Sequence, residues 1–520
     1  KRVQDQVDAI YSNPANVAKT RSKQQLQSAM VIVDVSTGDI VAMAGGVGEK
    51  TTHNGWNIAT DSKLQTGSAM KPVAVYAPAF EAGAISPATV VPDLPVSYSG
   101  GPFPKNDNRT YSFSRTVFSG ITSSVNAVSV RTLRMTGYDY SYHFAKEKFR
   151  LSDLTDHYVT SNGSVKSDLG DSPLGLGALT VGATVRDMAA AYATFANDGI
   201  WREARTYTKV YDSNGNLVLD NTQDSEQILS QKTVNYMNYC LQSVVTSGTG
   251  REAAISGQNV AGKTGTTSSN KDRWFCGYTK HYAAAVWCGY YNPEVIRITS
   301  GENNPAAVLF RKVLKPVHSG LAKEALYSTS SFRGYGMCLD TGDAATSACE
   351  KDLRYYLSGT GRTASAYAYK GDGPSGTCNR HVLVEYCSTG GGVATDYCHK
   401  FAAVEDVSID SRALLKMTPS EVQVIRDALG AGLKSTFGDN RYVYYISEDG
   451  SGLDWHGFDG SANKNVSAPY VVCPAHNKET WEAYEAEQAA KETEPPVIEG
   501  EGGEVPPEQT PQETTGEAQG

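Results

Sequence analysis

The sequence predicts an α+β fold in which helices pack around one antiparallel five-stranded sheet. Strand-like runs occur near the start of the chain, at 29–44, and again at 259–291, whereas the stretch between them is mostly helical. Strands from both ends of a domain can meet in one antiparallel sheet, and the intervening helices then cover its faces.

The first two strands are predicted as a hairpin. Residues 29–44 read AMVIVDVSTGDIVAMA, with β-rich runs on both sides of the polar turn from Ser36 to Asp39. A short glycine-containing turn between two such runs is typical of a β-hairpin. The polar residues 1–28 ahead of it predict a linker with a lead-in helix.

Two helical patterns stand out in the middle of the chain, over 68–83 and over 184–199. Pro72 is compatible with the first, because proline is tolerated in the first turn of a helix. The second has a capping-box-like start and a glycine stop. Residues 84–120 are rich in Pro, Gly and Ser and predict mostly loop, with a helical stretch over 113–119.

The sheet is completed by three predicted strands at 260–266, 274–279 and 282–290, which polar turns connect. A final helix is predicted over 305–323. Pro316 is expected to kink or end that helix, because proline cannot donate the backbone hydrogen bond that a helix interior requires.

A length of 520 residues suggests two or three domains. The α+β domain is placed at 29–326, after the lead-in at 1–28. The composition then changes to short Gly-, Ser-, Thr- and Cys-rich runs, which predict an accessory region of unknown role at 327–476. The acidic, Pro- and Glu-rich residues 477–520 predict a disordered tail, apart from a short polar helix over 477–490.

The net charge of −9 argues against a nucleic-acid partner, because nucleic acid is bound by basic surfaces. No apolar run reaches the roughly 18 residues that a membrane span needs. The chain begins at Lys1 with neither a Met nor a signal peptide. It is therefore expected to be a fragment or processed product, with any membrane anchor upstream.

Six of the nine cysteines crowd into the accessory region, which favours disulfides and an oxidising, extracytoplasmic setting. These six are Cys338, Cys349, Cys378, Cys387, Cys398 and Cys473. A zinc site is the alternative, with ligands from Cys378, Cys387, Cys398, His381 and His399. Because the region contains no Cys-x-x-Cys pair, disulfides or free thiols are preferred and no metal site is predicted. No internal repeat is evident.

Ser68 and Lys71 are the first candidate catalytic pair. On a helix their spacing places both side chains on one face. A serine hydroxyl becomes a good nucleophile when a neighbour takes its proton, and a lysine can do so if burial or a second cation lowers its pKa. Lys263 is the candidate second cation. The alternative is an ordinary N-cap serine with an exposed lysine.

Ser124 and Asn126 form the second candidate motif, Ser-Val-Asn. The Ser124 hydroxyl could relay a proton between the lysine and a leaving group, and the Asn126 amide could bind a substrate backbone. The alternative is a polar turn or cap.

Lys263, Thr264, Gly265 and Thr266 form the third motif and lie within a predicted strand. Glycine weakens a strand, and one good reason for it is that another backbone approaches there. A substrate peptide could add to this strand as a further β-strand. The lysine and threonines could then hold a carboxylate, while the Thr266 N–H completes an oxyanion hole. The alternative is a bulge or turn.

The order and context of the three motifs distinguish them from chance matches. Ser-x-x-Lys recurs at Ser268 and at Ser461, and each copy also contains Ser-x-Asn, whereas Lys-Thr-Gly occurs once. Only the set at Ser68, Ser124 and Lys263 falls in order on a helix, a helix-flanked turn and a strand. This set matches the motifs of penicillin-recognising enzymes.

Residues 25–325 resemble the transpeptidase domain of penicillin-binding proteins, most closely the bifunctional class A enzymes. Beyond the motifs, the resemblance rests on LQSAMVIVDVSTGDIVAMAGG, LGLGALTVGATVRDMAAAYATFANDGI, SGTGREA and DRWFCGYT. It implies the penicillin-binding-protein and serine β-lactamase type of α+β fold. The glycosyltransferase domain of a class A enzyme is absent from this chain, and the region after 327 matches no part of the family.

The resemblance implies a peptidoglycan D,D-transpeptidase that forms a serine acyl-enzyme. Ser68 would attack the D-Ala-D-Ala bond of a stem peptide, with Lys71 as base and Ser124 as proton shuttle. The carboxylate, oxyanion and substrate contacts would come from Lys263, Asn126, Thr264, Gly265 and Thr266. β-Lactams would acylate Ser68, and no cofactor is implied.

The resemblance also implies a place in the bacterial cell envelope. The full-length protein would be membrane-anchored, with divisome or elongation proteins as candidate partners. Three other functions stay open. A class A β-lactamase has Ser-Asp-Asn where this chain has Ser124-Val-Asn126. A D,D-carboxypeptidase uses water as the acceptor, and a penicillin-sensing module is acylated without turning over peptide.

Overall fold

The computed structural model describes most of the chain in detail. The described residues are 1–50, 55–112, 114–353, 361–374, 376–418 and 472–493, with Ser420, Glu421, Val424, Asp427 and the strands at 442–447 and 453–457 between them. The predicted disordered tail beyond 493, the Ser461 motif copy and Phe113 lie outside these residues. In the part that is described, no helix is long and apolar enough to cross a membrane.

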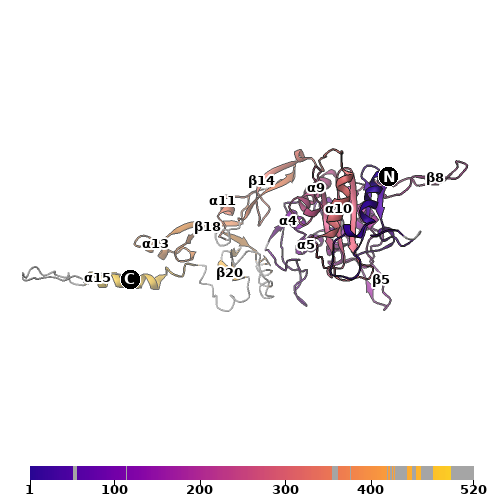
Figure 1. Ribbon diagram of the computed structural model, residues 1–520. Helices are drawn as coiled ribbons and strands as arrows, with labels where there is room; N and C mark the ends of the chain where they lie inside the picture. Colours follow the sequence, from indigo (N-terminus) through magenta and orange to yellow (C-terminus); the bar gives the residue numbers. More distant parts are fainter. Residues whose placement is uncertain are drawn as a thin grey trace, which may run out of the picture. The chain divides into compact units, whose positions relative to one another are not determined.

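A five-stranded antiparallel sheet organises the first part of the chain (Figure 1). Its strands follow the order β11-β12-β13-β1-β2. Their bounds are β1 Gln27–Asp34, β2 Ile40–Ala44, β11 Ala261–Thr266, β12 Arg273–Tyr278 and β13 Tyr282–Gly289. The central strand β1 joins the N-terminal hairpin to the three later strands, so the two ends of the domain meet in one sheet.

Both faces of the sheet are buried at β1, because successive side chains of a strand point to opposite faces and nearly all of those in β1 are buried. Val31 and Val33 belong to the core on one face, which helix α8 (Val185–Ala196) covers. Met30 and Ile32 belong to the core on the other face, with α1 (Arg2–Tyr11) and α10 (Pro305–Val317). These layers define the α+β fold.

The remaining elements surround this sheet or follow it. The other described helices of the first part are η1 Pro14–Asn16, α2 Ile58–Asp61, η2 Gly67–Met70, η3 Pro72–Tyr76, α3 Ala77–Glu81, α4 Val117–Thr122, α5 Asn126–Thr136, α6 Tyr138–His143, η4 Phe144–Lys148, α7 Pro173–Leu176, α9 Gln231–Thr246 and η5 Arg251–Ala253. Short strands are β3 Val90–Val91, β4 Arg115–Thr116, β5 Tyr158–Val159, β6 Val165–Lys166, β7 Ile200–Arg202, β8 Lys209–Tyr211, β9 Leu217–Asp220 and β10 Ser225–Gln227.

The later part of the chain contains β14 Phe332–Cys338 with β15 Thr363–Tyr369, then β16 His381–Cys387, β17 Gly392–Val393, β18 Ile409–Met417, β19 Tyr442–Ser447 and β20 Leu453–Gly457. Its helices are η6 Thr329–Ser331, α11 Ser347–Glu350, α13 Asp396–Ala402 and α15 Lys478–Thr493. The chain divides into two compact units, one of 1–384 with 411–471 and the other of 385–410 with 472–520.

The hairpin and the three closing strands are confirmed within one or two residues, and the helix predicted over 184–199 is confirmed as α8, Val185–Ala196. The predicted helix over 68–83 is helical but irregular, because it consists of a 3₁₀ turn, a π-helical turn and a short α-helix. The helix predicted over 113–119 is present but begins later, because β4 occupies Arg115–Thr116 and α4 spans Val117–Thr122. Helix α9 has no counterpart in the sequence prediction.

Two glycines let the edge strand β11 lie directly against the turn η2. A Cβ atom at Gly265 would come within 2.4 Å of the Thr66 carbonyl oxygen, and one at Gly67 within 2.4 Å of the Thr266 carbonyl oxygen. Both clashes are with backbone, which cannot move aside as a flexible side chain can. The glycine in β11 is therefore explained by the chain's own turn, rather than by an approaching peptide as the sequence suggested.

We predict that Gly265→Ala destabilises the fold by about 1–3 kcal/mol, because the methyl group forces the strand and the turn apart. The matched control is Gly336→Ala in β14, where a Cβ has no heavy atom within 4 Å. That variant should change the free energy of unfolding by less than about 0.5 kcal/mol. Chemical denaturation of both variants tests the contrast, and equal stability would contradict the close approach.

Candidate active site

The fold brings the three sequence motifs into one site. Ser68 and Lys71 come from the η2 turn and its end, Ser124 and Asn126 from the loop between α4 and the first turn of α5, and Lys263 from the edge strand β11. Hydrogen bonds link the motifs, because Lys71 and Lys263 both reach the Ser124 residue. The predicted site residues therefore lie together.

Lys71 is fully buried and held by two acceptors. Its Nζ donates to the Ser124 carbonyl oxygen at 3.0 Å and to Asn126 Oδ1 at 2.7 Å. Burial and then the positive charge of Lys263 hold the pKa of Lys71 well below its ordinary value, while Asp107 opposes them. A neutral amine has two hydrogens and one lone pair, so these two bonds leave the lone pair free to accept a proton.

Lys263 is the second buried amine of the site. It donates to Ser124 Oγ at 2.7 Å and to the Thr264 carbonyl oxygen at 3.2 Å. Burial lowers the pKa of Lys263 to about 7. The backbone of Ser124 has a φ of +58°, a left-handed conformation that residues other than glycine adopt rarely. This conformation lets its carbonyl face one lysine while its hydroxyl meets the other.

Ser68 is only partly buried, whereas both lysines are inaccessible to solvent. Hydrogen bonds on both sides fix the turn that carries it. The Tyr192 hydroxyl donates to the Ala69 carbonyl oxygen at 2.7 Å, and Trp274 Nε1 donates to the Gln65 carbonyl oxygen at 2.8 Å. Ser68 thus lies, partly exposed, on a rigid turn that ends at the buried Lys71, and among the described residues no hydrogen bond joins its hydroxyl to either lysine.

The strand threonines are held by residues outside the motifs. The hydroxyls of Thr264 and Thr249 are 2.8 Å apart, and Arg273 Nη1 donates to Thr266 Oγ1 at 2.8 Å. Burial lowers the pKa of Arg273, although its guanidinium stays positive at neutral pH. Thr249 lies within SGTGREA and Arg273 within DRWFCGYT, two segments that resemble the family. The sequence did not identify either residue as part of the site.

A buried polar network that the sequence did not indicate supports the Ser124 loop. Asn106 Oδ1 accepts from the backbone N–H groups of Asn126 and Ala127, each at 3.1 Å. Asn106 Nδ2 donates to Asp93 Oδ1 at 2.7 Å, and Arg115 Nε donates to Asp93 Oδ2 at 2.9 Å. This network caps the start of α5 and so holds Asn126 against Lys71.

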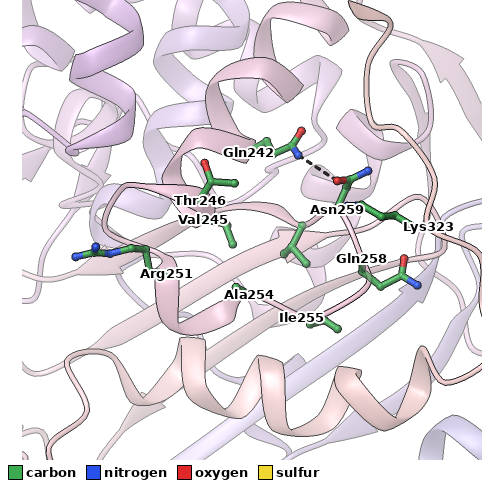
Figure 2. A pocket seen from close by; sticks show the side chains of 10 residues that line it. Gln242, Val245, Thr246, Arg251, Ala254, Ile255, Gln258, Asn259 and Lys323 are labelled. Carbon is green, nitrogen blue, oxygen red and sulfur yellow. Dashed lines mark hydrogen bonds between the residues drawn. The ribbon is translucent and has the colours of Figure 1, made fainter.

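The competing motif copy at Ser268 has none of these features. Ser268 is exposed in the turn that follows β11. A hollow lies beside the residues that precede β11, and it contains none of the motif residues. Figure 2 shows that it is lined by residues such as Gln242 and Asn259, which share a 3.3 Å hydrogen bond. No catalytic candidate lines this hollow.

The cysteines differ from the sequence expectation. All nine are buried free thiols, so the favoured disulfides are wrong. Six of them instead form two groups, each with one histidine. The first is Cys338, Cys349, Cys378 and His381, and the second is Cys387, Cys398, Cys473 and His476. The zinc alternative mixed ligands from both groups, and its His399 belongs to neither.

The family described as penicillin binding protein transpeptidase domain matches residues 28–315. Penicillin-binding protein 1A of Clostridium perfringens is 30% identical over 383 residues, which are 72% of this chain and 44% of that protein. Penicillin-binding protein 1F of Bacillus subtilis is 31% identical over 297 residues, or 56% of this chain and 39% of that protein. The chain thus spans less than half the length of these relatives.

Solved structures share the fold. Penicillin-binding protein 1A from Haemophilus influenzae superposes with a TM-score of 0.52 at 21% identity, covering 68% of this chain and 54% of that one. The PonA1 protein from Mycobacterium tuberculosis in complex with penicillin V gives 0.50 at 21% identity, covering 62% of this chain and 85% of that one.

We predict that Asn106→Ala lowers the free energy of unfolding by about 1–3 kcal/mol, because it leaves buried donors and an acidic acceptor without their partner. The matched control is Asn108→Ala, whose exposed side chain accepts one bond from the Thr110 N–H. The control should lie within about 0.5 kcal/mol of wild type. Denaturant unfolding measures both, and an equally small change in Asn106→Ala would show that the network adds no stability.

Proposed function

We propose, from the premise that this chain belongs to the penicillin-binding protein transpeptidase family, that it is a peptidoglycan D,D-transpeptidase acting through Ser68. The observation that carries the proposal is the buried arrangement in which Lys71 and Lys263 both bond to Ser124, beside the partly exposed Ser68. This arrangement supports Lys71 as the base and Ser124 as the proton shuttle for Ser68, which lies in the same turn as Lys71.

Acylation begins when Lys71 takes the proton of Ser68 while Ser68 Oγ attacks the carbonyl carbon of the terminal D-Ala-D-Ala bond. The backbone N–H groups of Ser68 and Thr266 receive the negative charge that develops on the carbonyl oxygen. The tetrahedral species then collapses and the peptide C–N bond breaks. The proton reaches the departing amine of D-alanine through the Ser124 hydroxyl, which leaves Ser68 as an ester and Lys71 neutral again.

Deacylation reverses these roles with a new nucleophile. The amine of a second stem peptide attacks the ester carbonyl and gives a proton to Lys71. Ser68 Oγ then leaves and regains a proton, so the enzyme is unchanged and one new peptide bond links two stems. The open edge of β11 suits an extended donor peptide, because β12 is its one neighbour in the described sheet.

Substrate recognition is assigned to β11 and the start of α5 in the same site. Lys263, Thr264 and Thr266 hold the terminal carboxylate, with Arg273 adding positive charge through its bond to Thr266. Asn126 binds the donor backbone. A β-lactam carries the same carboxylate and a strained amide, and its leaving nitrogen stays tethered, so the ester at Ser68 persists.

For the whole protein we propose the bacterial cell envelope as location and a membrane anchor outside this chain. The catalytic domain is assigned to residues 29–326. Its partners would be peptidoglycan stem peptides, β-lactams and proteins of the division or elongation machinery.

We predict that a fluorescent penicillin labels wild type covalently and labels Ser68→Ala at background level. The matched control, Ser268→Ala, removes the serine of the competing Ser-x-x-Lys copy and should label like wild type. Equal labelling of Ser68→Ala and wild type would overturn the assignment of the nucleophile.

The alternative functions are distinguished by incubating the protein with a D-Ala-D-Ala peptide and an amine acceptor and identifying the products. Amide product indicates transpeptidation, and free acid alone would indicate a D,D-carboxypeptidase. Acylation without any turnover would indicate a penicillin sensor, and rapid loss of the penicillin adduct would indicate a β-lactamase.

A further inference from the structure

We propose that the two cysteine–histidine groups after the transpeptidase domain are structural zinc sites, each with three thiolates and one imidazole. In each group the ligand atoms all lie within 4.8 Å of one another, and all eight residues are buried. Nothing in the proposed catalytic reaction uses these residues. The groups lie in the region that the sequence left unexplained.

The interatomic distances fit a tetrahedral zinc ion. With bonds of about 2.3 Å to sulfur and about 2.0 Å to nitrogen, neighbouring sulfur and nitrogen ligands lie about 3.5 Å apart. His381 Nδ1 is 3.6 Å from Cys338 Sγ and 3.3 Å from Cys378 Sγ. His476 Nδ1 is 3.3 Å from Cys387 Sγ and 3.4 Å from Cys473 Sγ.

The composition of each group favours a metal over disulfides. Three cysteines cannot all pair with one another, so one disulfide would leave an odd buried thiol beside the histidine. Soft thiolates together with an imidazole select zinc among the common divalent ions. Four protein ligands also close the coordination sphere, which is the property of structural sites rather than catalytic ones.

The first group has the outer partner that a metal-bound histidine requires. His381 turns Nδ1 toward the cysteines and places Nε2 2.8 Å from Asp352 Oδ2. A carboxylate on the far nitrogen fixes the ring orientation and keeps the metal-facing nitrogen available as a ligand. Asp352 is itself buried. We assign it as a positioning residue for the first site.

The two groups are copies of one structural motif, which the sequence inspection missed. Cys338 and Cys349 have the same spacing as Cys387 and Cys398, and both pairs enclose an Ala-Thr at matching positions. The later ligands repeat as Cys378-x-x-His381 and Cys473-x-x-His476. Two copies with the same ligand order indicate one chemical role.

Backbone contacts repeat with the same offset. In the first copy Gly342 N–H donates to the Cys338 carbonyl oxygen at 2.9 Å, and in the second Gly391 N–H donates to the Cys387 carbonyl oxygen at 2.8 Å. Both glycines have positive φ, at +83° and +77°. In each copy a backbone N–H also points at a sulfur, as from Thr346 to Cys349 and from Thr395 to Cys398.

A metal would also stabilise the small unit that holds the second group, residues 385–410 with 472–520. Among the described residues of this unit, the buried apolar cluster around the group consists of its three cysteines, with Ala394, Val407 and Ile409 partly buried against it. A core of that size is far too small to stabilise an ordinary domain. Zinc binding to thiolates supplies the missing free energy, as it does in other small metal-dependent folds.

The test measures metal in the full chain, purified in reductant with zinc and then desalted. Elemental analysis should give about two zinc ions per chain, from the two groups. Cys378→Ser and Cys473→Ser should each lose about one zinc, and the double variant both. The matched control is His399→Ala, an exposed histidine next to Cys398 that lies outside both groups and should keep two.

Asp352→Asn provides a variant that keeps all eight ligands. It should lower the zinc affinity of the first site by roughly 10–100-fold in a chelator competition, while the affinity of the second site is unchanged. Cobalt substitution gives a second readout, because tetrahedral thiolate coordination produces visible absorption bands that a disulfide lacks.

Absence of bound metal with the six thiols oxidised would overturn the proposal in favour of disulfides. Iron or copper in place of zinc would overturn the identity of the ion, and full zinc content in both cysteine variants would overturn the ligand set. Penicillin labelling at Ser68 in the same samples reports on the transpeptidase site separately, so failure of one proposal is distinguishable from failure of the other.

Discussion

The burial of two lysine amines around one serine is the interaction on which the candidate site depends. Lys71 and Lys263 have no solvent to stabilise their charges, and the charge of Lys263 further lowers the pKa of Lys71. Ser124 accepts from both of them, through its carbonyl and its hydroxyl. The protein thereby keeps a neutral amine beside Ser68 at a pH at which an exposed lysine would be charged.

Much of the surrounding fold serves to maintain that burial. The sheet edge carries Lys263, the turn η2 carries Ser68 and Lys71, and Gly67 and Gly265 allow their backbones to touch. The third element, the Ser124 loop, is held by Asn106, which accepts a hydrogen bond from the Asn126 N–H and donates one to Asp93. Three segments distant in the sequence thus converge within hydrogen-bonding distance, which is why the motifs acquire meaning only together.

The sequence predicted well those features that are encoded locally. The two β-rich runs within 29–44 and the polar turn from Ser36 to Asp39 are sufficient to specify a hairpin, and the cap and glycine stop define α8. Helix α9 was not predicted, although Val234, Met237, Leu241 and Val244 are buried at helical spacing. Polar residues interrupt this apolar pattern on the same buried face, among them Asn238, which bonds to Phe195, Leu326 and Tyr278.

The residues that the sequence did not indicate depend on long-range contacts. In the sequence Asn106 looks like any other loop asparagine, and only the folded chain shows that it caps the start of α5. The metal-ligand sets were likewise hidden, because Cys387 and Cys473 are far apart in the chain, and His476 was not linked to them. Ser68 could be preferred over Ser268 and Ser461 from the sequence, because the family resemblance indicates which motifs meet in the folded domain and motif spacing alone does not.

The most direct test of the central claim is the pH dependence of the rate at which penicillin acylates Ser68. Burial lowers the pKa of Lys263 to about 7, and burial with the charge of Lys263 holds the pKa of the base, Lys71, well below its ordinary value. We predict a rate that rises with pH and levels off well below the pH at which a solvated lysine loses its proton. A rate that continues to rise through pH 10, as for a solvated lysine, would contradict it.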